Sequence, residues 1–246
     1  MTSFKGRTLL LTGAAGGIGR EIAALFLARE ANLVLADLDE AAVQDMAHML
    51  DPQGTHVVAT RYDAGAEDDA AAIVAVATRH FGGIDFLVPG AGIYPESPLE
   101  GMSGPEWRKV ITINLDSVFY LCRAAIPALR DGSAVVTMTS VAAHKGSQNH
   151  AHYSASKGAV LSLTRSLALE LGARTRANAV SPGIIDTAMT RELRGQKGNA
   201  LLVQTPLQRF GHPREVASVV SFLCSDDASF VNGEVIHVNG GLYIAG

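Results

Sequence analysis

Short apolar runs alternate with longer helical patterns along almost the whole chain, and this alternation constrains the fold more than any other feature. Seven runs rich in leucine or β-branched residues predict strands at 7–12, 32–37, 55–60, 84–88, 133–139, 176–181 and 234–238. Helical patterns lie between them near 17–30, 39–50, 66–81, 104–130, 153–173 and 213–225. Such alternation is typical of βαβ units around a parallel sheet. We therefore expect a single α/β domain, residues 1–246, with a doubly wound sheet of about seven strands and helices on both faces.

Local signals agree with these elements, except in one region. Ser103 and Glu106 form a capping box with Pro105 between them, and Pro213 opens the last long helix. The stretch from about Asp186 to Gly211 has no clear periodicity and is too long for a routine connection. We expect one mobile segment there.

Composition narrows the class of protein. The chain is 48% hydrophobic and only 18% charged, which fits a parallel sheet covered on both faces or a large subunit interface. A net charge of −4 offers no basic field for nucleic acid. No apolar run approaches the roughly 20 residues that span a bilayer, and the first strand begins near Arg7, too early for a signal peptide. Cys122 and Cys224 read as small core residues of a reducing compartment. We expect a cytoplasmic protein with neither nucleic acid nor membrane as a partner.

Four of the seven residues after the first predicted strand are glycine, in the stretch "LLLTGAAGGIGRE" from Leu9 to Glu21. Glycines between a strand and a helix let a pyrophosphate approach unpaired N–H groups at the positive end of the helix dipole. The alternative is an ordinary glycine turn. The spacing T-G-x-x-x-G-x-G is neither a P-loop nor G-x-G-x-x-G. However, Asp37 ends the second strand 18 residues after Gly19, where dinucleotide folds place the acid that binds the adenosine ribose. The two features together favour a nucleotide site.

A second group of residues points to proton transfer. Tyr153 and Lys157 are four residues apart in a helical pattern and therefore share a face. A close cation favours the phenolate, and lowering a tyrosine pKa by about 3 units corresponds to roughly 4 kcal/mol. Ser140 ends the fifth strand at the sheet edge where such folds bind ligands. Tyr153 is therefore a candidate general acid/base.

Asn114 lies within the apolar stripe of the helix expected at 104–130. A buried amide must be paired, so Asn114 is either a satisfied core residue or part of the site.

These residues resemble the motifs of the short-chain dehydrogenase/reductase family, over essentially the whole chain. The matching motifs are Thr12-Gly13-x-x-x-Gly17-Ile18-Gly19, Asn114, Ser140, Tyr153-x-x-x-Lys157 and "NAVSPGIIDT" from Asn178 to Thr187. The resemblance implies a Rossmann-type fold and a reaction between an alcohol and a ketone. It implies that Tyr153 transfers the proton and that Ser140 orients the substrate oxygen. It also implies that Lys157 lowers the tyrosine pKa and holds the nicotinamide ribose, and that Asn114 positions a water.

The same resemblance assigns cofactor contacts. Asp63 would contact the adenine, and Ile185 and Thr187 the carboxamide and phosphate region. The segment after Thr187, at about 187–210, would be a substrate lid. The full set of expected cofactor-binding residues is Gly13, Gly16, Gly17, Ile18, Gly19, Asp37, Asp63, Ala64, Ala91, Gly92, Tyr153, Lys157, Pro182, Gly183, Ile185 and Thr187.

One motif departs from the family. Pro89-Gly90-Ala91-Gly92 stands where the family usually has Asn-Asn-Ala-Gly. Backbone contacts to the cofactor ribose could survive this change, but the asparagine side-chain bonds that brace the sheet could not. We expect reduced local rigidity and intact catalysis.

The expected cofactor is NAD rather than NADP. Gly16 and Leu38 occupy the two places where NADP-dependent members usually carry a basic residue, and a 2′-phosphate would face the Asp37 carboxylate.

The substrate is left open between two enzymes. The closest overall resemblance is to bacterial 3-oxoacyl-acyl-carrier-protein reductases, in which Arg130 and Arg174 would dock an acidic carrier protein. Two solvated helix-end arginines are the alternative. Those enzymes usually take NADPH, so Asp37 favours a catabolic alcohol dehydrogenase instead. The polar residues expected to meet a hydroxylated substrate are His144, Gln148, His150 and His152. No carboxylate or cysteine joins His150-x-His152, so no metal is expected.

A non-catalytic dinucleotide sensor is a remoter alternative, because such proteins tend to lose the tyrosine or the lysine. The resemblance further implies a homotetramer in which the helices at 104–130 and 153–173 pack across one axis, and the apolar C-terminal stretch "VIHVNGGLYIAG" agrees with buried subunit contacts.

Overall fold

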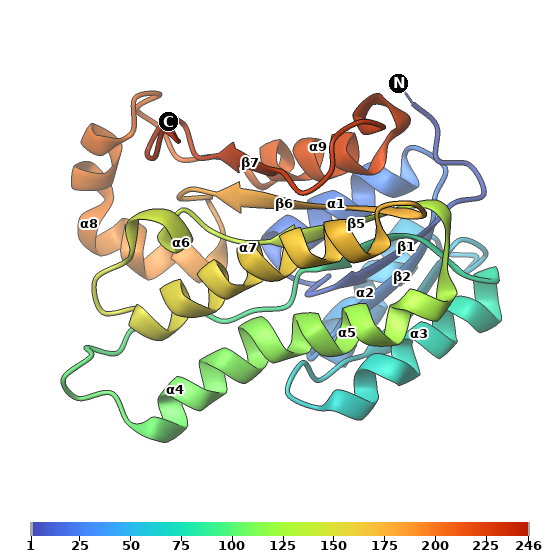
Figure 1. Cartoon of the computed structure of the whole chain (residues 1–246), viewed down its shortest axis with the longest axis horizontal. Coiled ribbons are helices and arrows are strands. Elements are labelled where there is room, and N and C mark those ends of the chain that lie inside the picture. The colour runs from blue at the N-terminus through green and yellow to red at the C-terminus, as the bar shows by residue number, and fades with distance from the viewer. Residues whose placement is uncertain (1, 246) are drawn as a thin grey trace.

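Seven parallel strands form the centre of the molecule in the computed structural model, which describes residues 2–245 (Figure 1). Their order across the sheet is β3-β2-β1-β4-β5-β6-β7. The strands are β1 (Thr8–Thr12), β2 (Asn32–Asp37), β3 (Val57–Arg61), β4 (Ile84–Pro89), β5 (Leu129–Met138), β6 (Thr175–Pro182) and β7 (Val235–Val238). The predicted doubly wound α/β class is confirmed, since every adjacent pair is parallel.

Helices cover both faces of the sheet, which explains why the inner strands are apolar throughout. One face packs against α1 (Gly17–Leu27), α2 (Glu40–Leu50) and α9 (Pro213–Cys224). The other packs against α3 (Glu67–Phe81), α5 (Ser117–Ala125) and α7 (Ala151–Leu171). Every residue of β1 and β4 is buried, as expected of strands covered on both sides.

The single helix predicted at 104–130 is divided into four parts. It consists of α4 (Gly104–Ile111), a π-helical turn η1 (Thr112–Asp116), α5 and a 3₁₀ turn η2 (Ile126–Ala128). The capping box of Ser103 and Glu106 begins α4 as predicted. The predicted end was wrong: the helix stops at Ala128 because Pro127 lacks the N–H that would continue it, and Leu129 and Arg130 open β5.

This helical stretch, Gly104–Ala128, is also long and apolar enough to cross a membrane by length and composition alone. Charged side chains such as Lys109, Asp116 and Arg123 interrupt this stretch, so it contains no unbroken apolar run of that length. In the fold, Val118, Leu121 and Ala125 are buried, and α5 packs on α3 and β4. Burial in a covered sheet accounts for the same apolar composition.

The region without periodicity contains structure that the sequence did not predict. A 3₁₀ turn η3 (Ala188–Thr190) leads into α8 (Arg191–Gln204). None of the residues of α8 is buried, so the helix has no apolar stripe for periodicity to reveal. A short helix α6 (Ala142–Lys145) after β5 was also missed, because one turn carries no period.

Candidate active site

The glycine loop after β1 is built by close backbone approaches. Gly13 has φ +67°, and a Cβ atom on it would lie 2.7 Å from the Gly90 carbonyl oxygen. A Cβ on Gly19 would collide with the Gly13 carbonyl oxygen. Gly16 precedes α1 and caps it with no side chain, which leaves N–H groups of the first helical turn for a ligand. This is the arrangement that binds a phosphate anion.

A cavity of about 220 Å³ opens directly over this loop. Thr187 covers it from the segment after β6: a Cβ on Gly17 would come within 2.8 Å of the Thr187 methyl carbon. The expected cofactor residues that line the cavity are Gly13, Gly16, Gly17, Ile18, Gly19, Gly92, Tyr153, Lys157, Pro182, Gly183, Ile185 and Thr187. A glycine cradle that side chains would fill, beside an uncapped helix N-terminus, fits a dinucleotide pyrophosphate.

Asp37 lies at the rim of the glycine loop rather than in the cavity wall. One carboxylate oxygen accepts a hydrogen bond from Ala15 N at 2.9 Å, and the other accepts from Asp39 N at 3.2 Å. Each oxygen keeps a further lone pair for a ribose hydroxyl. Arg20 donates from Nε to the Ala15 carbonyl at 2.8 Å, so one cation also lies at this loop.

Asp63 and Ala64 follow β3, next to the end of β2. The Asp63 carboxylate accepts from Gly65 N at 2.9 Å, and Arg61 forms ion pairs with Asp63 at 3.4 Å and Asp69 at 3.6 Å. Arg61 is therefore engaged by two carboxylates and is less available than Arg20 for a phosphate.

The Pro89-Gly90 replacement is braced in a different way from the family's asparagines. The Thr12 hydroxyl accepts from Gly90 N at 3.1 Å and from Ala91 N at 3.3 Å. A Cβ on Gly90 would lie 2.6 Å from the Thr12 carbonyl oxygen, so β4 and β1 approach each other closely here. These contacts join β4 to β1 at the replaced motif, and the expected loss of local rigidity stays a prediction.

Tyr153 and Lys157 lie on one face of α7, as predicted. The Lys157 Nζ atom is 5.8 Å from the centre of the Tyr153 ring and donates to the Met138 carbonyl at 2.9 Å. Burial raises the pKa of Tyr153 to about 12, while Ser140 beside the phenol acts in the opposite direction. Burial also lowers the pKa of Lys157 to about 8. In the protein without a bound dinucleotide, burial therefore dominates the pKa of Tyr153, and the expectation that Lys157 lowers it stays a prediction.

Asn114 lies in the π-helical turn and is fully buried. Its Oδ1 accepts from Ile93 N at 2.8 Å, and its Nδ2 donates to the Ile93 carbonyl at 2.9 Å and to Ser156 Oγ at 3.4 Å. The side chain therefore fixes the segment after Gly92, as a satisfied core asparagine does. Its implied role with a water stays a prediction.

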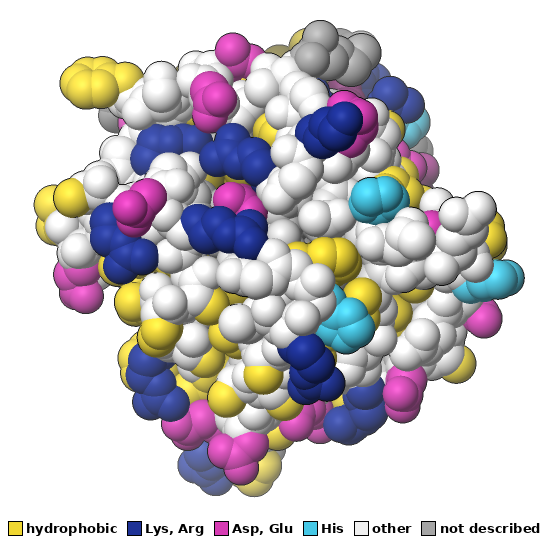
Figure 2. All heavy atoms as spheres, turned by 90° about the vertical axis from the view of Figure 1, so that its right-hand side faces the viewer, with side chains coloured by type: hydrophobic (Ala, Val, Ile, Leu, Met, Phe, Trp, Pro, Cys, Tyr) yellow, Lys and Arg dark blue, Asp and Glu magenta, His cyan; other side chains and the backbone are white. Residues whose placement is uncertain are grey.

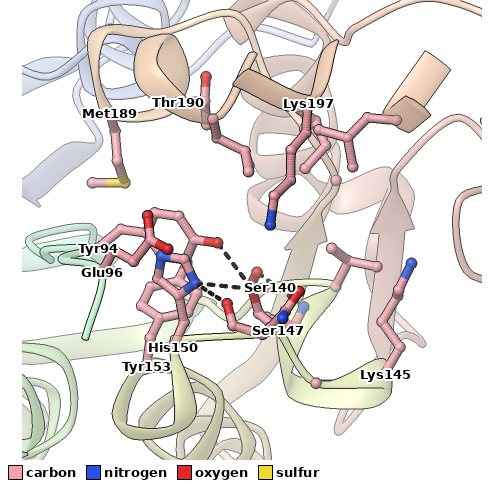
Figure 3. Close-up of a pocket in the computed structure, with 18 of the residues that line it drawn as sticks. Tyr94, Glu96, Ser140, Lys145, Ser147, His150, Tyr153, Met189, Thr190 and Lys197 are labelled. Atoms are coloured by element: carbon pink, nitrogen blue, oxygen red, sulfur yellow. Dashed lines mark hydrogen bonds between the residues drawn. The ribbon is translucent and has the colours of Figure 1, made fainter. Parts of the chain in front are cut away.

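A second cavity, of about 410 Å³, lies on the other side of Ser140 and Tyr153 (Figure 3). Tyr94 forms one wall, where it stacks on His150 with ring centres 3.9 Å apart and meets the edge of Tyr153 at 4.6 Å. Its hydroxyl bonds to Ser147 Oγ at 3.0 Å. Tyr94 was not predicted, and the one available signal was an aromatic residue two positions after the Gly92 turn.

The four polar residues expected to meet the substrate divide into two pairs. Gln148 and His150 line the larger cavity. His152 is fully buried, and the His144 ring packs against His237 at 4.6 Å. The placement of His144 and His152 at the substrate was therefore wrong, because alternate residues of this segment face different neighbours.

Arg130 and Arg174 lie at the opposite end of the sheet from Tyr153. Arg130 opens β5 and bonds to Asp85 at 2.6 Å; Arg174 precedes β6 and bonds to Asp131 at 2.9 Å. Ser140 follows the far end of β5, about 30 Å away at roughly 3.3 Å per residue. Figure 2 views this amino-terminal edge and shows Lys and Arg interspersed with Asp and Glu. The expectation of an arginine pair at the entrance to its own chain's site was wrong.

Comparisons with known proteins agree with this architecture. A family model described as enoyl-(acyl carrier protein) reductase matches residues 13–243. The 3-oxoacyl-[acyl-carrier-protein] reductase of Salmonella typhimurium is 36% identical over 98% of this chain and 99% of its own length. The reductase of the same name from Escherichia coli K12 is 35% identical over the same shares. A crystal structure from Brucella melitensis, described as short-chain dehydrogenase/reductase SDR:glucose/ribitol dehydrogenase, is 53% identical, covers 100% of both chains and has a TM-score of 0.97.

A seven-stranded parallel sheet with two cavities meeting at Tyr153 and Ser140 defines a dinucleotide-dependent oxidoreductase. With full-length relatives above 30% identity, the chain belongs to the short-chain dehydrogenase/reductase family. It is an oxidoreductase that acts on CH–OH groups with a nicotinamide dinucleotide.

Proposed function

We propose that this protein interconverts a secondary alcohol and a ketone with NAD, and that Tyr153 transfers the substrate proton. The observation that carries the proposal is the position of Tyr153 and Ser140 in the wall shared by the two cavities. A substrate oxygen in the larger cavity would meet both hydroxyls while its carbon faces the smaller one. The bound dinucleotide supplies or accepts the hydride.

The pKa values support a division of roles. A Tyr153 pKa of about 12 keeps the phenol protonated at neutral pH, ready to donate to a developing alkoxide in the reductive direction. Ser140 is placed to donate to the same oxygen. Lys157, with a pKa of about 8, is protonated below that pH and would then stabilise a Tyr153 phenolate during alcohol oxidation.

The proposed preference for NAD rests on Asp37. Its two oxygens would accept hydrogen bonds from the ribose hydroxyls, whereas a 2′-phosphate would be repelled. The cofactor contacts at Asp63, Ala64 and Ala91 belong to the same proposal.

The larger cavity is lined by apolar and polar side chains together. Its polar members would suit a hydroxylated substrate, and they include Ser147, Gln148, Thr190, Gln196 and Gln204. The Brucella protein carries a name that includes glucose and ribitol, which agrees with a hydroxylated substrate.

The second candidate is a 3-oxoacyl-[acyl-carrier-protein] reductase, because relatives of that name match over 98% of the chain. Since Arg130 and Arg174 lie far from Tyr153 in one chain, a carrier protein would reach the site over other surfaces or over a second subunit. Activity on acyl-carrier substrates that exceeds activity on free polar alcohols, with NADPH preferred, would select this candidate.

The test is a panel of sugar alcohols, hydroxysteroids, cyclic alcohols and acetoacetyl thioesters, followed by NADH absorbance. Tyr153→Phe should lower kcat by about 10³-fold, within the range of general acid/base catalysis, and leave the dinucleotide Kd within about twofold. Lys157→Ala should damage both, because it also removes a ribose contact. If Tyr153→Phe kept most of its activity, the proton-transfer assignment would be refuted.

We further propose a cytoplasmic homotetramer, with residues 187–210 as the substrate lid. Trp107 on α4, Phe119 on α5 and Leu169 on α7 are 38%, 44% and 87% exposed, which suits a helix-to-helix contact between subunits. Light scattering at micromolar concentration should give four chains, and a monomer would contradict the proposal.

A further inference from the structure

Two lysines line the larger cavity from different elements. Lys145 belongs to the last turn of α6, and Lys197 belongs to α8. Within residues 2–245, neither ammonium group forms a hydrogen bond or an ion pair. Both side chains are exposed, so each brings three donors and a positive charge to the cavity and has solvent rather than a protein group as its acceptor.

Two carboxylates line the same cavity, but neither bonds to a lysine. Glu96 accepts a hydrogen bond from Asn149 Nδ2 at 2.6 Å, and Glu192 accepts from Gln196 Nε2 at 3.0 Å. An amide donor is neutral, so both carboxylates keep their charge. The two ammonium groups remain the charged donors of this lining without a protein acceptor in the described part of the chain.

The two lysines approach from opposite walls. Figure 3 shows Lys197 pointing down from α8 toward Ser140, while Lys145 rises from the far side of the cavity. The first turn of α8 is anchored by an ion pair of Arg194 with Asp186 at 2.5 Å. The rest of α8, which includes Lys197, has no buried side chain and forms no ion pair in the described part of the chain. A negative group that bonded to both lysines would link α8 to α6 across the cavity.

We propose that the substrate is a small hydroxy acid or oxo acid whose carboxylate binds between Lys145 and Lys197. This inference rests on the proposed alcohol–ketone reaction at Tyr153. A cavity of about 410 Å³ suits a small molecule. A single negative charge is favoured over a phosphate dianion, because Glu96 and Glu192 line the same cavity and would repel the second charge.

The first experiment compares each acid with a neutral partner on the same skeleton. The pairs are 2-, 3- and 4-hydroxy acids of four to six carbons beside their amides, and aldonates beside the matching sugar alcohols. For the best pair, the wild type should prefer the acid at least thirtyfold in kcat/KM, mainly through KM. Lys145→Gln and Lys197→Gln should each lower this ratio about tenfold. Lys109→Gln, on the exposed side of α4, is the matched control and should leave the ratio unchanged.

The second experiment needs no turnover. Hydrogen exchange of residues 191–204 should slow when the best acid is added with NADH, and the neutral partner should have no such effect. In the Lys145→Gln/Lys197→Gln double variant, the acid should no longer slow exchange. Equal exchange with acid and neutral partner in the wild type would overturn the proposal.

The outcomes separate this inference from the function on which it rests. Turnover of neutral alcohols with no preference for acids, or an acid preference that survives in the double variant, would overturn the carboxylate site alone. Loss of all alcohol turnover, with the acid still slowing exchange of α8, would instead overturn the proposed reaction.

Discussion

The two cavities that meet at Tyr153 are built in opposite ways. Around the smaller one, backbone lies against backbone: Gly13, Gly19 and Gly90 each approach a carbonyl oxygen so closely that a single Cβ atom would collide with it. Around the larger one, the wall is made of side chains, and α8 contributes no buried residue. The cofactor side is therefore fixed by main-chain geometry, whereas the substrate side is free to change by substitution.

This difference has a physical basis. A dinucleotide presents the same pyrophosphate to every member of such a fold, so the protein meets it with N–H groups whose positions depend on glycine. Substrates differ, and exposed side chains on a loosely packed helix can differ with them. Rigid and variable halves of one site are the expected result.

Within this comparison of the two cavities, the largest expected effect concerns Asp37 at the cofactor side of the site. Wild-type protein should prefer NAD over NADP by at least about a hundredfold in kcat/KM, roughly 2.7 kcal/mol, because Asp37 would face the 2′-phosphate. Changing Asp37 to serine and Leu38 to arginine should reverse the order. The measurement is the kcat/KM ratio of the two cofactors in both proteins, with one substrate at fixed salt.

A wild-type ratio near one would contradict the assignment. It would indicate that a nearby cation reaches the phosphate, and Arg20, which already bonds to the Ala15 carbonyl at the glycine loop, is the first candidate. Arg20→Gln would then lower NADP activity selectively.

A pair of glycine substitutions tests the contrast between the two halves directly. Gly19→Ala should weaken dinucleotide binding by about a hundredfold, because its Cβ would collide with the Gly13 carbonyl oxygen and displace the loop. Gly195→Ala in α8 meets nothing within 4 Å and should be neutral or stabilising by about 0.4–1 kcal/mol. Dinucleotide titration and thermal unfolding of both variants check this. Similar losses of dinucleotide affinity in the two variants would contradict the difference between the rigid cofactor side and the variable substrate side.

The smallest expected effect is on the free energy of unfolding, through Lys157 in the wall of the smaller cavity. Burial lowers the pKa of Lys157 to about 8 from an ordinary value near 10.5, so the unfolded chain holds this proton more tightly. Below about pH 8, Lys157 is charged in both states, so the full cost of burying its charge lowers the free energy of unfolding. Between about pH 8 and 10.5, the folded protein loses this proton before the unfolded chain does, so the wild type becomes more stable as pH rises. Lys157→Met should raise Tm by a few degrees at pH 7 and lose activity.

The check for this prediction is the difference in unfolding free energy between Lys157→Met and wild type, measured in urea from pH 7 to 10. The difference should shrink as pH rises, and the exposed Lys109→Met should show no such trend. A difference that stays constant with pH would mean that the lysine is not destabilised by burial.

The sequence predicted best the features that depend on repeated apolar runs or on fixed spacing between motif residues. The seven strands and the covered sheet follow from apolar runs, and the glycine loop, Ser140, Tyr153 and Lys157 follow from motif spacing at strand and helix ends. Tyr94 could not be predicted, because it enters the site through a loop whose path depends on Asn114 holding Ile93. The position of Arg130 was missed because Pro127, three residues earlier, ends the helix and places the arginine in the first part of a strand.

The burial of Tyr153 and Lys157 could not be predicted from their spacing in the sequence. The spacing of four positions from Tyr153 to Lys157 predicts that the two side chains are neighbours, which is confirmed, but it does not predict how much water surrounds them. Burial of both groups depends on β5, α6 and the segment after β6, which are distant in sequence. The direction of the tyrosine pKa shift follows from that tertiary packing.

The π-helical turn at Thr112–Asp116 affects which neighbouring helices the two ends of its helix contact. A π turn holds about one residue more than an α turn, and each residue corresponds to about 100° of rotation. The two ends of the helix are therefore out of rotational phase, so α4 packs on α7 while α5 packs on α3. Deleting one residue within this turn would leave a more regular helix, yet it would rotate one end relative to the other. The irregularity thus lets one continuous helix serve two different contacts, with Asn114 at the junction.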